Sequence, residues 1–348
     1  MKTKTKIKNL SREELEAFMS EIGEPRFRAK QIAEWLYSKN AASFDDMSNL
    51  PKTLRDALDK KFAINSLRTA VRENAADGTT KFAFELSDGA RIESVLIPSD
   101  ERITLCVSSQ AGCKRACRFC ATGALGFTRN LQPAEIIDQF LEARRAVEPD
   151  RKITNLVFMG MGEPFDNFAN LVKALTAITS KDGCGVSPRR ITVSTVGITD
   201  RFEEFGRLGL ANLAISLNAP DDKTRALIMP SNKKYPIHKI VDACREYPLR
   251  GSDRITFEYV LLAGINDSEH NAHRLSGLLS GIPCRINLIP FNEFPGSELK
   301  RPNPDVVEQF RKTVLQRGLD VFVRRSRGQE ISAACGRLGG RRFDKEEE

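Results

Sequence analysis

Long hydrophobic runs are missing from this 348-residue sequence. It has no stretch of about 18 consecutive apolar residues, so a membrane-spanning helix is not expected. The first ten residues are basic, but no apolar segment follows them. This pattern argues against a secretory signal and predicts a cytoplasmic protein with no membrane partner.

Cysteine lacks the density of a disulfide framework, since eight residues are spread over the whole chain. A small secreted domain stapled by disulfides is therefore excluded. Three of the eight are clustered, at Cys113, Cys117 and Cys120. In a cytoplasmic protein such clustering indicates metal or redox chemistry.

Positive charge is concentrated near the two ends of the sequence. The net charge is 54 − 46 = +8, with +5 in residues 1–72 (15 basic, 10 acidic) and +7 in residues 311–342 (9 basic, 2 acidic). Basic ends around a slightly acidic middle favour a polyanionic partner such as nucleic acid over a merely solvated face. The length predicts roughly two domains, at about 150 residues each.

The N-terminal part reads as helical and is followed by a β-hairpin. Residues 10–72 have helical spacing and begin with a capping box, Ser11 to Glu14. Phe27 and Trp35 are expected in the core of this small domain. Residues 80–98 alternate with period two around the turn Asp88-Gly89, which predicts two paired strands.

From about residue 101, short apolar runs alternate with helix-length segments. This order predicts right-handed βαβ crossovers and a parallel sheet. Six units are too few for a closed eight-stranded barrel, so we expect a partial barrel with its chemistry at the carboxyl ends of the strands. The predicted strands are 103–107, 155–161, 191–196, 212–217, 256–262 and 285–290, and the predicted helices are 133–146, 168–179, 235–247, 269–279 and 304–317.

We accordingly divide the chain into four segments. A helical accessory RNA-binding domain is expected over 1–75 and a β-hairpin linker over 76–100. The partial barrel, with a C-terminal segment carrying a reactive cysteine, is expected over 101–340 and a disordered tail over 341–348.

The strongest local signal is the C-x3-C-x2-C run of Cys113, Cys117 and Cys120 after the first strand of the α/β region. A [4Fe-4S] cluster normally takes four cysteines, so three leave one iron with an open position. Structural zinc is the alternative, but a closed zinc site needs a fourth ligand. The candidates His238, His270 and His273 lie far away in the sequence.

With the Gly162-Glu163 pair at the end of the second predicted strand, this run resembles the radical S-adenosylmethionine (SAM) superfamily. The resemblance implies a partial (β/α)6 barrel, a [4Fe-4S] cluster whose open iron binds SAM, and a 5′-deoxyadenosyl radical. Glu163 would accept from the SAM ammonium, and the glycines would let the backbone approach its methionine part. Segments 105–113, 232–235, 287–292 and 331–336 narrow the resemblance to the RlmN/Cfr family of RNA adenine methyltransferases, over about residues 20–340.

This resemblance assigns roles residue by residue. It makes Cys335 the carrier of a transferred methyl group, Cys106 the thiol that resolves the protein–RNA adduct through a transient disulfide with Cys335, and Glu93 the proton acceptor. The positions that it implies for SAM contact are Gly162, Glu163, Ser194, Ser216, Leu217, Asn218 and Asn292. Asn218 departs from the family, where histidine is common, but an asparagine amide still donates and accepts hydrogen bonds.

The residues alone leave alternatives open. Cys106 shares a more polar strand face with Thr104 and Ser108, and Cys335 follows the basic run 324–327, which favours a thiolate. A buried inert thiol is the alternative at Cys335, and an outward, solvated strand glutamate is the alternative at Glu93. The remaining cysteines, Cys184, Cys244 and Cys284, are expected to be ordinary core residues.

The implied activity is methylation of adenine carbon 2 in 23S rRNA at the peptidyl-transferase centre, and of the adenosine 3′ to the anticodon in some tRNAs. Two SAM molecules would be used per turnover, with electrons from a flavodoxin- or ferredoxin-type partner, and the enzyme would be a monomer. The alternatives are Cfr-type methylation of carbon 8 in the same rRNA adenine, and a non-catalytic, metal-stabilised RNA-binding protein.

Overall fold

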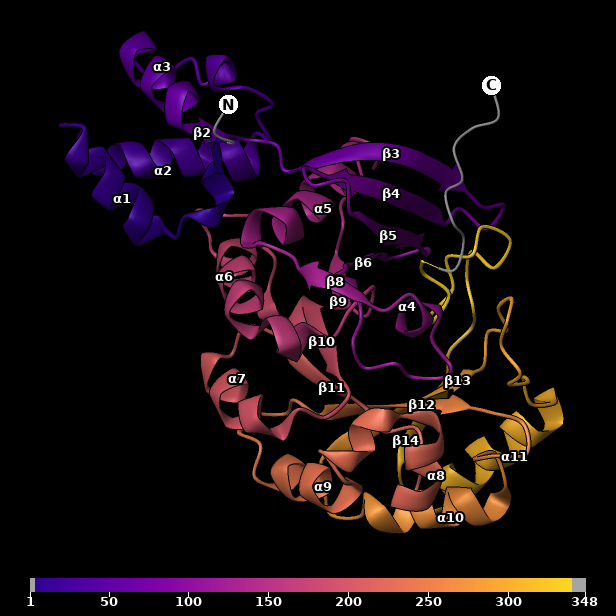
Figure 1. The fold of residues 1–348 in the computed structure, drawn as a ribbon. Coiled ribbons are helices and arrows are strands. Elements are labelled where there is room, and N and C mark those ends of the chain that lie inside the picture. The colour runs from indigo at the N-terminus through magenta and orange to yellow at the C-terminus, as the bar shows by residue number, and fades with distance from the viewer. Residues whose placement is uncertain (1–3, 340–348) are drawn as a thin grey trace.

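A computed structural model describes residues 4–339 as a small helical domain packed beside a partial barrel (Figure 1). The predicted tail, 341–348, lies outside the described residues. None of the helices within residues 4–339 is long and apolar enough to cross a membrane.

The N-terminal domain is helical, as predicted, and its first helix begins with the expected capping box. The Ser11 side chain accepts from the Glu14 amide, and Glu14 accepts from the Ser11 amide at 2.6 Å. The expected core position of Phe27 is wrong, because its ring is 57% exposed; Trp35 is half-buried. The elements are β1 (Thr5–Lys6), α1 (Arg12–Glu21), α2 (Phe27–Ala33), α3 (Lys52–Lys61) and β2 (Phe62–Ala63), with short turns η1 (Ile7–Asn9), η2 (Glu34–Ser38) and η3 (Phe44–Asp46).

The predicted hairpin forms from β4 (Thr80–Leu86) and β5 (Arg91–Pro98), which pair antiparallel. A third strand, β3 (Leu67–Asn74), pairs with β4, so the helical prediction for this end of residues 10–72 is wrong. Strand β3 lies at the edge of the sheet, and no residue in it is fully buried. Such a strand shows no alternation of apolar residues, and only its pairing reveals it.

The barrel wall is parallel, and all six predicted strands are present. Strand β5 pairs antiparallel with β6, which joins the three-stranded part to the barrel in one ten-stranded sheet. A seventh parallel strand, β14, extends the six-stranded prediction; it has four residues and exposes Phe322 by 57%, so it carries little apolar signal. The parallel strands are β6 (Ile103–Cys106), β9 (Asn155–Phe158), β10 (Ile191–Thr195), β11 (Asn212–Ser216), β12 (Ile255–Leu261), β13 (Cys284–Pro290) and β14 (Asp320–Val323).

Helices cover the outer face of the wall (Figure 1). Along β10, Ile191 and Val193 are fully buried, whereas Thr192 and Ser194 alternate with them and are only half-buried. This alternation leaves polar side chains for the inside of the barrel. The helices are α5 (Pro133–Arg145), α6 (Phe168–Thr179), α7 (Phe202–Leu208), α8 (Asp222–Ile228), α9 (Ile237–Arg245), α10 (Glu269–Leu278) and α11 (Pro304–Gln316); short α4 (Ala121–Ala124) and a ribbon of β7 (Gln110–Gly112) and β8 (Phe127–Asn130) follow β6.

Candidate active site

One pocket gathers most of the predicted site residues. They come from the loop after β7, from the carboxyl ends of β9, β10, β11 and β13, and from the segment after β14. This placement follows the rule that parallel α/β folds hold their ligands at the carboxyl ends of strands. The predicted residues that line the pocket are Cys113, Cys117, Cys120, Gly162, Glu163, Ser194, Ser216, Asn218, Asn292 and Cys335.

The cysteine loop, residues 113–120, leaves the β7–β8 ribbon at a sharp turn. Gly112 has φ +74°, and a Cβ there would lie 2.1 Å from the Gly126 carbonyl oxygen, so only glycine fits. The Cys113 amide donates to that same oxygen at 2.7 Å. Arg115 then binds Asp166 with two guanidinium nitrogens, which fixes the loop to the turn after β9.

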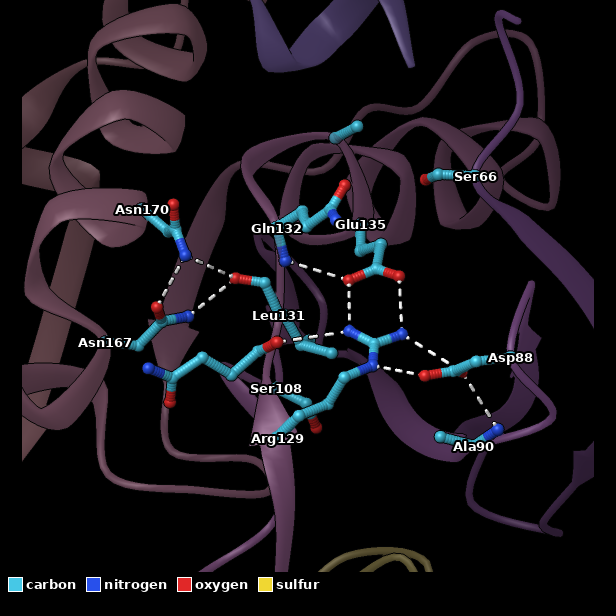
Figure 2. Close-up of polar contacts among 12 residues, drawn as sticks. Ser66, Asp88, Ala90, Ser108, Arg129, Leu131, Gln132, Glu135, Asn167 and Asn170 are labelled. Carbon is cyan, nitrogen blue, oxygen red and sulfur yellow. Dashed lines mark hydrogen bonds and ion pairs between the residues drawn. The ribbon is translucent and has the colours of Figure 1, made fainter. Parts of the chain in front are cut away.

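The ribbon itself is anchored on both sides by Arg129 of β8 (Figure 2). Its guanidinium donates to both Glu135 oxygens at 2.8 Å, and to Asp88 in the β4–β5 turn at 2.5 and 3.1 Å. The hydrogen bonds from Arg129 hold the pKa of Asp88 below its usual value. Helix α5 and the hairpin therefore both position the strand that carries the cysteine loop.

The three thiols fit an iron–sulfur cluster. Burial raises the pKa of Cys113 to about 12 and raises the pKa values of Cys117 and Cys120 as well, so a metal would be needed to hold these thiols as thiolates. Among residues 4–339, no three His, Cys, Asp or Glu side chains lie close enough to share one metal ion. In a cluster each cysteine binds its own iron, so the thiols can stand further apart than around zinc. The three histidines lie on α9 and α10, not in the pocket lining.

Glu163 is the buried carboxylate of the pocket. It is 2% exposed and accepts from the amides of Phe165 at 3.0 Å and Val196 at 2.8 Å. Burial raises its pKa to about 7. Its carboxylate is therefore held in place at the end of β9, where it can meet a cationic ligand group.

The glycines beside Glu163 are also required by packing within the protein. A Cβ on Gly162, whose φ is +98°, would lie 2.5 Å from Gln110 Cβ. A Cβ on Gly160 would lie 2.7 Å from the Val107 oxygen. These glycines let the turn after β9 pack against residues 107–110.

The next two strands add hydroxyls and an amide. The Ser194 and Ser216 hydroxyl oxygens lie 3.3 Å apart. Asn218 has φ +61°, and its amide oxygen accepts from the Val260 amide at 2.8 Å, while its nitrogen lies 3.3 Å from the Met229 sulfur. The side chain of Leu217 is fully buried outside the pocket lining, and its carbonyl accepts from Arg225 at 2.9 Å.

Cys335 joins the pocket from the C-terminal segment. Its carbonyl accepts from the Asn292 amide at 3.1 Å. The pKa of Arg324 is raised, first by the neighbouring Cys335 and then by Glu258 and Cys106, against the effect of burial. Burial raises the pKa of Cys106 to about 12, Cys335 raises it further and Arg324 lowers it. Both thiols thus lie near enough to Arg324 to interact with its charge, although Cys106 does not line the pocket.

Glu93 is buried on β5 and is only 3% exposed, so the outward, solvated position considered for it is wrong. Its carboxylate accepts from the Gly339 amide at 2.8 Å and lies 3.8 Å from the Lys81 nitrogen. Burial raises its pKa, and the Gly339 and Lys81 contacts oppose the rise. The C-terminal segment after Cys335 therefore covers Glu93.

Sequence reasoning missed two buried charged residues, Glu258 and Arg225. Glu258 and Arg324 line the pocket. Arg225 is fully buried and donates to the carbonyls of Val196, Leu217 and Tyr235 and to the Asn232 side chain, at 2.6 to 3.0 Å. These bonds explain the 232–235 motif, which holds an arginine that links the loops after β10 and β11.

Comparison with known proteins agrees with this geometry. A profile of the radical SAM superfamily matches residues 107–275, and one described as the ribosomal RNA large subunit methyltransferase N-terminal domain matches residues 5–64. The dual-specificity RNA methyltransferase RlmN of Geobacter sulfurreducens is 48% identical over 98% of this chain and 94% of its own. This chain belongs to the RlmN family. The RlmN of Geotalea uraniireducens is also 48% identical, over 97% of both chains.

The fold of this RlmN-family chain is likewise matched. A crystal structure of a radical SAM methyltransferase from Sphaerobacter thermophilus superposes with a TM-score of 0.93, at 41% identity, over 97% of this chain and 100% of the other. The protein is therefore a radical SAM RNA methyltransferase, and the radical SAM fold implies SAM and a [4Fe-4S] cluster as its cofactors.

Proposed function

We propose that this RlmN-family enzyme methylates carbon 2 of an adenine in 23S rRNA, at the peptidyl-transferase centre, and of the adenosine 3′ to the anticodon in some tRNAs. The observation that carries the proposal is the position of Cys335, which lines the same pocket as the three cysteines of the cluster loop. A methyl carrier beside a radical source is what the modification of an electrophilic ring carbon requires.

The chain's own residues would hold both cofactors. Cys113, Cys117 and Cys120 bind the [4Fe-4S] cluster, and Glu163 accepts from the ammonium of SAM. The other proposed SAM contacts are Gly162, Ser194, Ser216, Leu217, Asn218 and Asn292. When bound, the cluster supplies the electron that cleaves SAM and starts the radical chemistry.

Cys335 takes the methyl group of one SAM, and Arg324 lines the same pocket. After the methyl group gives a hydrogen atom to the 5′-deoxyadenosyl radical of a second SAM, its carbon bonds to carbon 2 of adenine and links the RNA to Cys335. The resulting adduct radical would return one electron to the oxidised cluster. Glu93 removes the ring proton. Cys106 then attacks the Cys335 sulfur and breaks its bond to the transferred carbon, which takes up a proton to complete the methyl group of the product. The two cysteines are left as a disulfide for an external thiol to reduce.

The RNA must present its adenine in a loop or flipped out of a stack. We propose that the basic N-terminal region and the segment after β14 grip phosphates. We further propose that the enzyme works as a cytoplasmic monomer and takes electrons from a flavodoxin- or ferredoxin-type donor.

The deciding experiment is mass spectrometry of nucleosides from protein-free 23S rRNA and tRNA, after incubation with cluster-loaded enzyme, SAM and a reductant. We expect 2-methyladenosine, and none from Cys335→Ala, which should still assemble the cluster. Cys106→Ala should accumulate an RNA–protein adduct that ribonuclease trims. Methylation by Cys335→Ala would remove the proposed methyl carrier.

Two other results would redirect the proposal. An 8-methyladenosine product would retain the mechanism but move the enzyme to the Cfr-type reaction. Stoichiometric zinc without acid-labile sulfide, in anaerobically purified protein, would favour the non-catalytic RNA-binding alternative, whereas about four irons with sulfide support the enzyme.

A further inference from the structure

A buried carboxylate in the pocket has one oxygen without a partner. Glu258 lies within β12, is 3% exposed and lines the pocket. Its Oε1 accepts from the Asn287 amide at 2.9 Å, but its Oε2 has no hydrogen-bond partner among residues 4–339. A buried acceptor is costly to leave unpaired, so this oxygen points to a ligand that donates a hydrogen bond.

Glu258 continues a polar row across the inside of the barrel. The strand order is β10, β11, β12, β13. The Ser194 and Ser216 hydroxyls lie 3.3 Å apart, Ser216 is the register partner of Glu258, and Glu258 is the register partner of Asn287. Two of these side chains are already proposed SAM contacts, which makes Glu258 the next position along the same ligand.

The position of Glu258 along the barrel wall determines which part of SAM it can reach. Glu163, proposed for the SAM ammonium, follows β9, and two strands separate β9 from β12. Neighbouring strands lie about 4.8 Å apart, so Glu258 is too far along the wall for the ammonium and is placed for the nucleoside end. That end offers two ribose hydroxyls and the adenine amine as donors.

The chemistry of a carboxylate favours the hydroxyls. A carboxylate only accepts, and its two oxygens can take hydrogen bonds from neighbouring hydroxyls. Acidic side chains bind ribose hydroxyls in the same way in dinucleotide sites. Because Asn287 holds Oε1, Oε2 remains for the ligand.

We propose that Glu258 binds a ribose hydroxyl of SAM through its Oε2 and so positions the nucleoside along the barrel wall. This inference rests on SAM binding in the pocket, as in the proposed function. It adds to the proposed SAM contacts a residue that no motif in the sequence indicates.

The test is SAM affinity, measured by anaerobic equilibrium dialysis with cluster-loaded protein and no RNA. The variants are Glu258→Gln, which retains the volume, and Glu258→Ala. Exposed Glu269→Gln on α10 is the matched control. Each protein is measured with SAM, with 2′-deoxy- and 3′-deoxy-SAM, and with N6-methyl-SAM, after equal iron content and equal melting temperature are checked.

We expect the Glu258 variants to bind SAM about 10- to 100-fold more weakly than wild type, and the control to bind normally. Wild type should bind one of the two deoxy analogues more weakly than SAM, by a similar factor. The Glu258 variants should bind that analogue almost as tightly as they bind SAM, because in these variants the hydroxyl has no carboxylate to bind. The N6-methyl analogue should weaken all proteins alike.

Three outcomes would overturn the inference. In the first, the Glu258 variants bind SAM as tightly as wild type. In the second, they bind SAM more weakly, but removing each hydroxyl from SAM weakens their binding as much as it weakens that of wild type. In the third, the only preference that they lose is the one for SAM over its N6-methyl analogue. A wild-type protein that fails to bind SAM would instead overturn the proposed function, and this inference with it. Because wild type and variants are measured together, the two failures are distinguished.

Discussion

At the scale of single residues, Asn218 suits the backbone conformation at its position. Its φ of +61° lies in the left-handed region, where asparagine is among the few acceptable side chains. Both ends of its amide contact the protein, at the Val260 amide and the Met229 sulfur. Asn218 therefore secures β12 against the loop after β11.

Asn218→Ala should destabilise the protein by about 2 kcal/mol, because alanine is strained at this φ and the half-buried Val260 amide loses its acceptor. Asn218→Gly loses the acceptor but tolerates the φ, so about half of that loss is expected. Urea unfolding of the cluster-free proteins measures both. An alanine variant as stable as wild type would contradict the role in holding β12.

Glu93 depends on Lys81, which is 1% exposed and lies 2.5 Å from Glu73 and 3.8 Å from Glu93. Burial raises the pKa of Glu93, Lys81 lowers it and Glu73 raises it. As the proposed base, Glu93 must be ionised, so activity should fall as pH drops through its pKa. Lys81→Met removes the lowering charge and should move the acid limb of the rate–pH profile to higher pH.

Two matched variants test the direction in which the acid limb moves. Lys81→Arg retains the charge and should restore the profile, whereas Glu73→Gln removes a neighbouring negative charge and should move the acid limb to lower pH. Single-turnover methylation rates across pH provide the measurement. If Lys81→Met lowered the rate equally at every pH, Lys81 would support only the structure.

At the scale of elements, the sequence predicted the strands and motifs that show a local pattern of residues. The apolar runs predicted six barrel strands, and the cysteine run was placed correctly after the first. Strands β3 and β14 were not foreseen, because an edge strand and a short, half-exposed strand bury too little to show a period.

Contacts in the site between segments that are distant in the sequence could not be predicted from local pattern. Glu93 was considered an outward residue because alternation along β5 cannot show that Gly339 covers it. Arg225 carries no motif of its own, yet it donates to three loop carbonyls and to Asn232. Glu258 was not predicted either, because its place beside Ser216 and Asn287 depends on how the strands pair.

At the scale of the whole molecule, one buried ion pair joins the N-terminal domain to the barrel. Lys8 and Asp138 of α5 are each at most 4% exposed at their side chains and form a short contact. The other Asp138 oxygen accepts from the Ser66 amide at 2.8 Å. Residues from both ends of the helical domain thus converge on one carboxylate of α5, which fixes the domain against the barrel.

Removing one charge from this pair should be far worse than removing both. Lys8→Met leaves Asp138 buried without its cation and should destabilise the protein by about 3–5 kcal/mol. Lys8→Met combined with Asp138→Asn removes both charges and retains an acceptor for Ser66, so most of the stability should return. Thermal unfolding of the two variants and wild type measures the difference. If the double variant were no more stable than Lys8→Met, the loss would come from packing around the Lys8 side chain, and the ion pair would not be what holds the domain to the barrel.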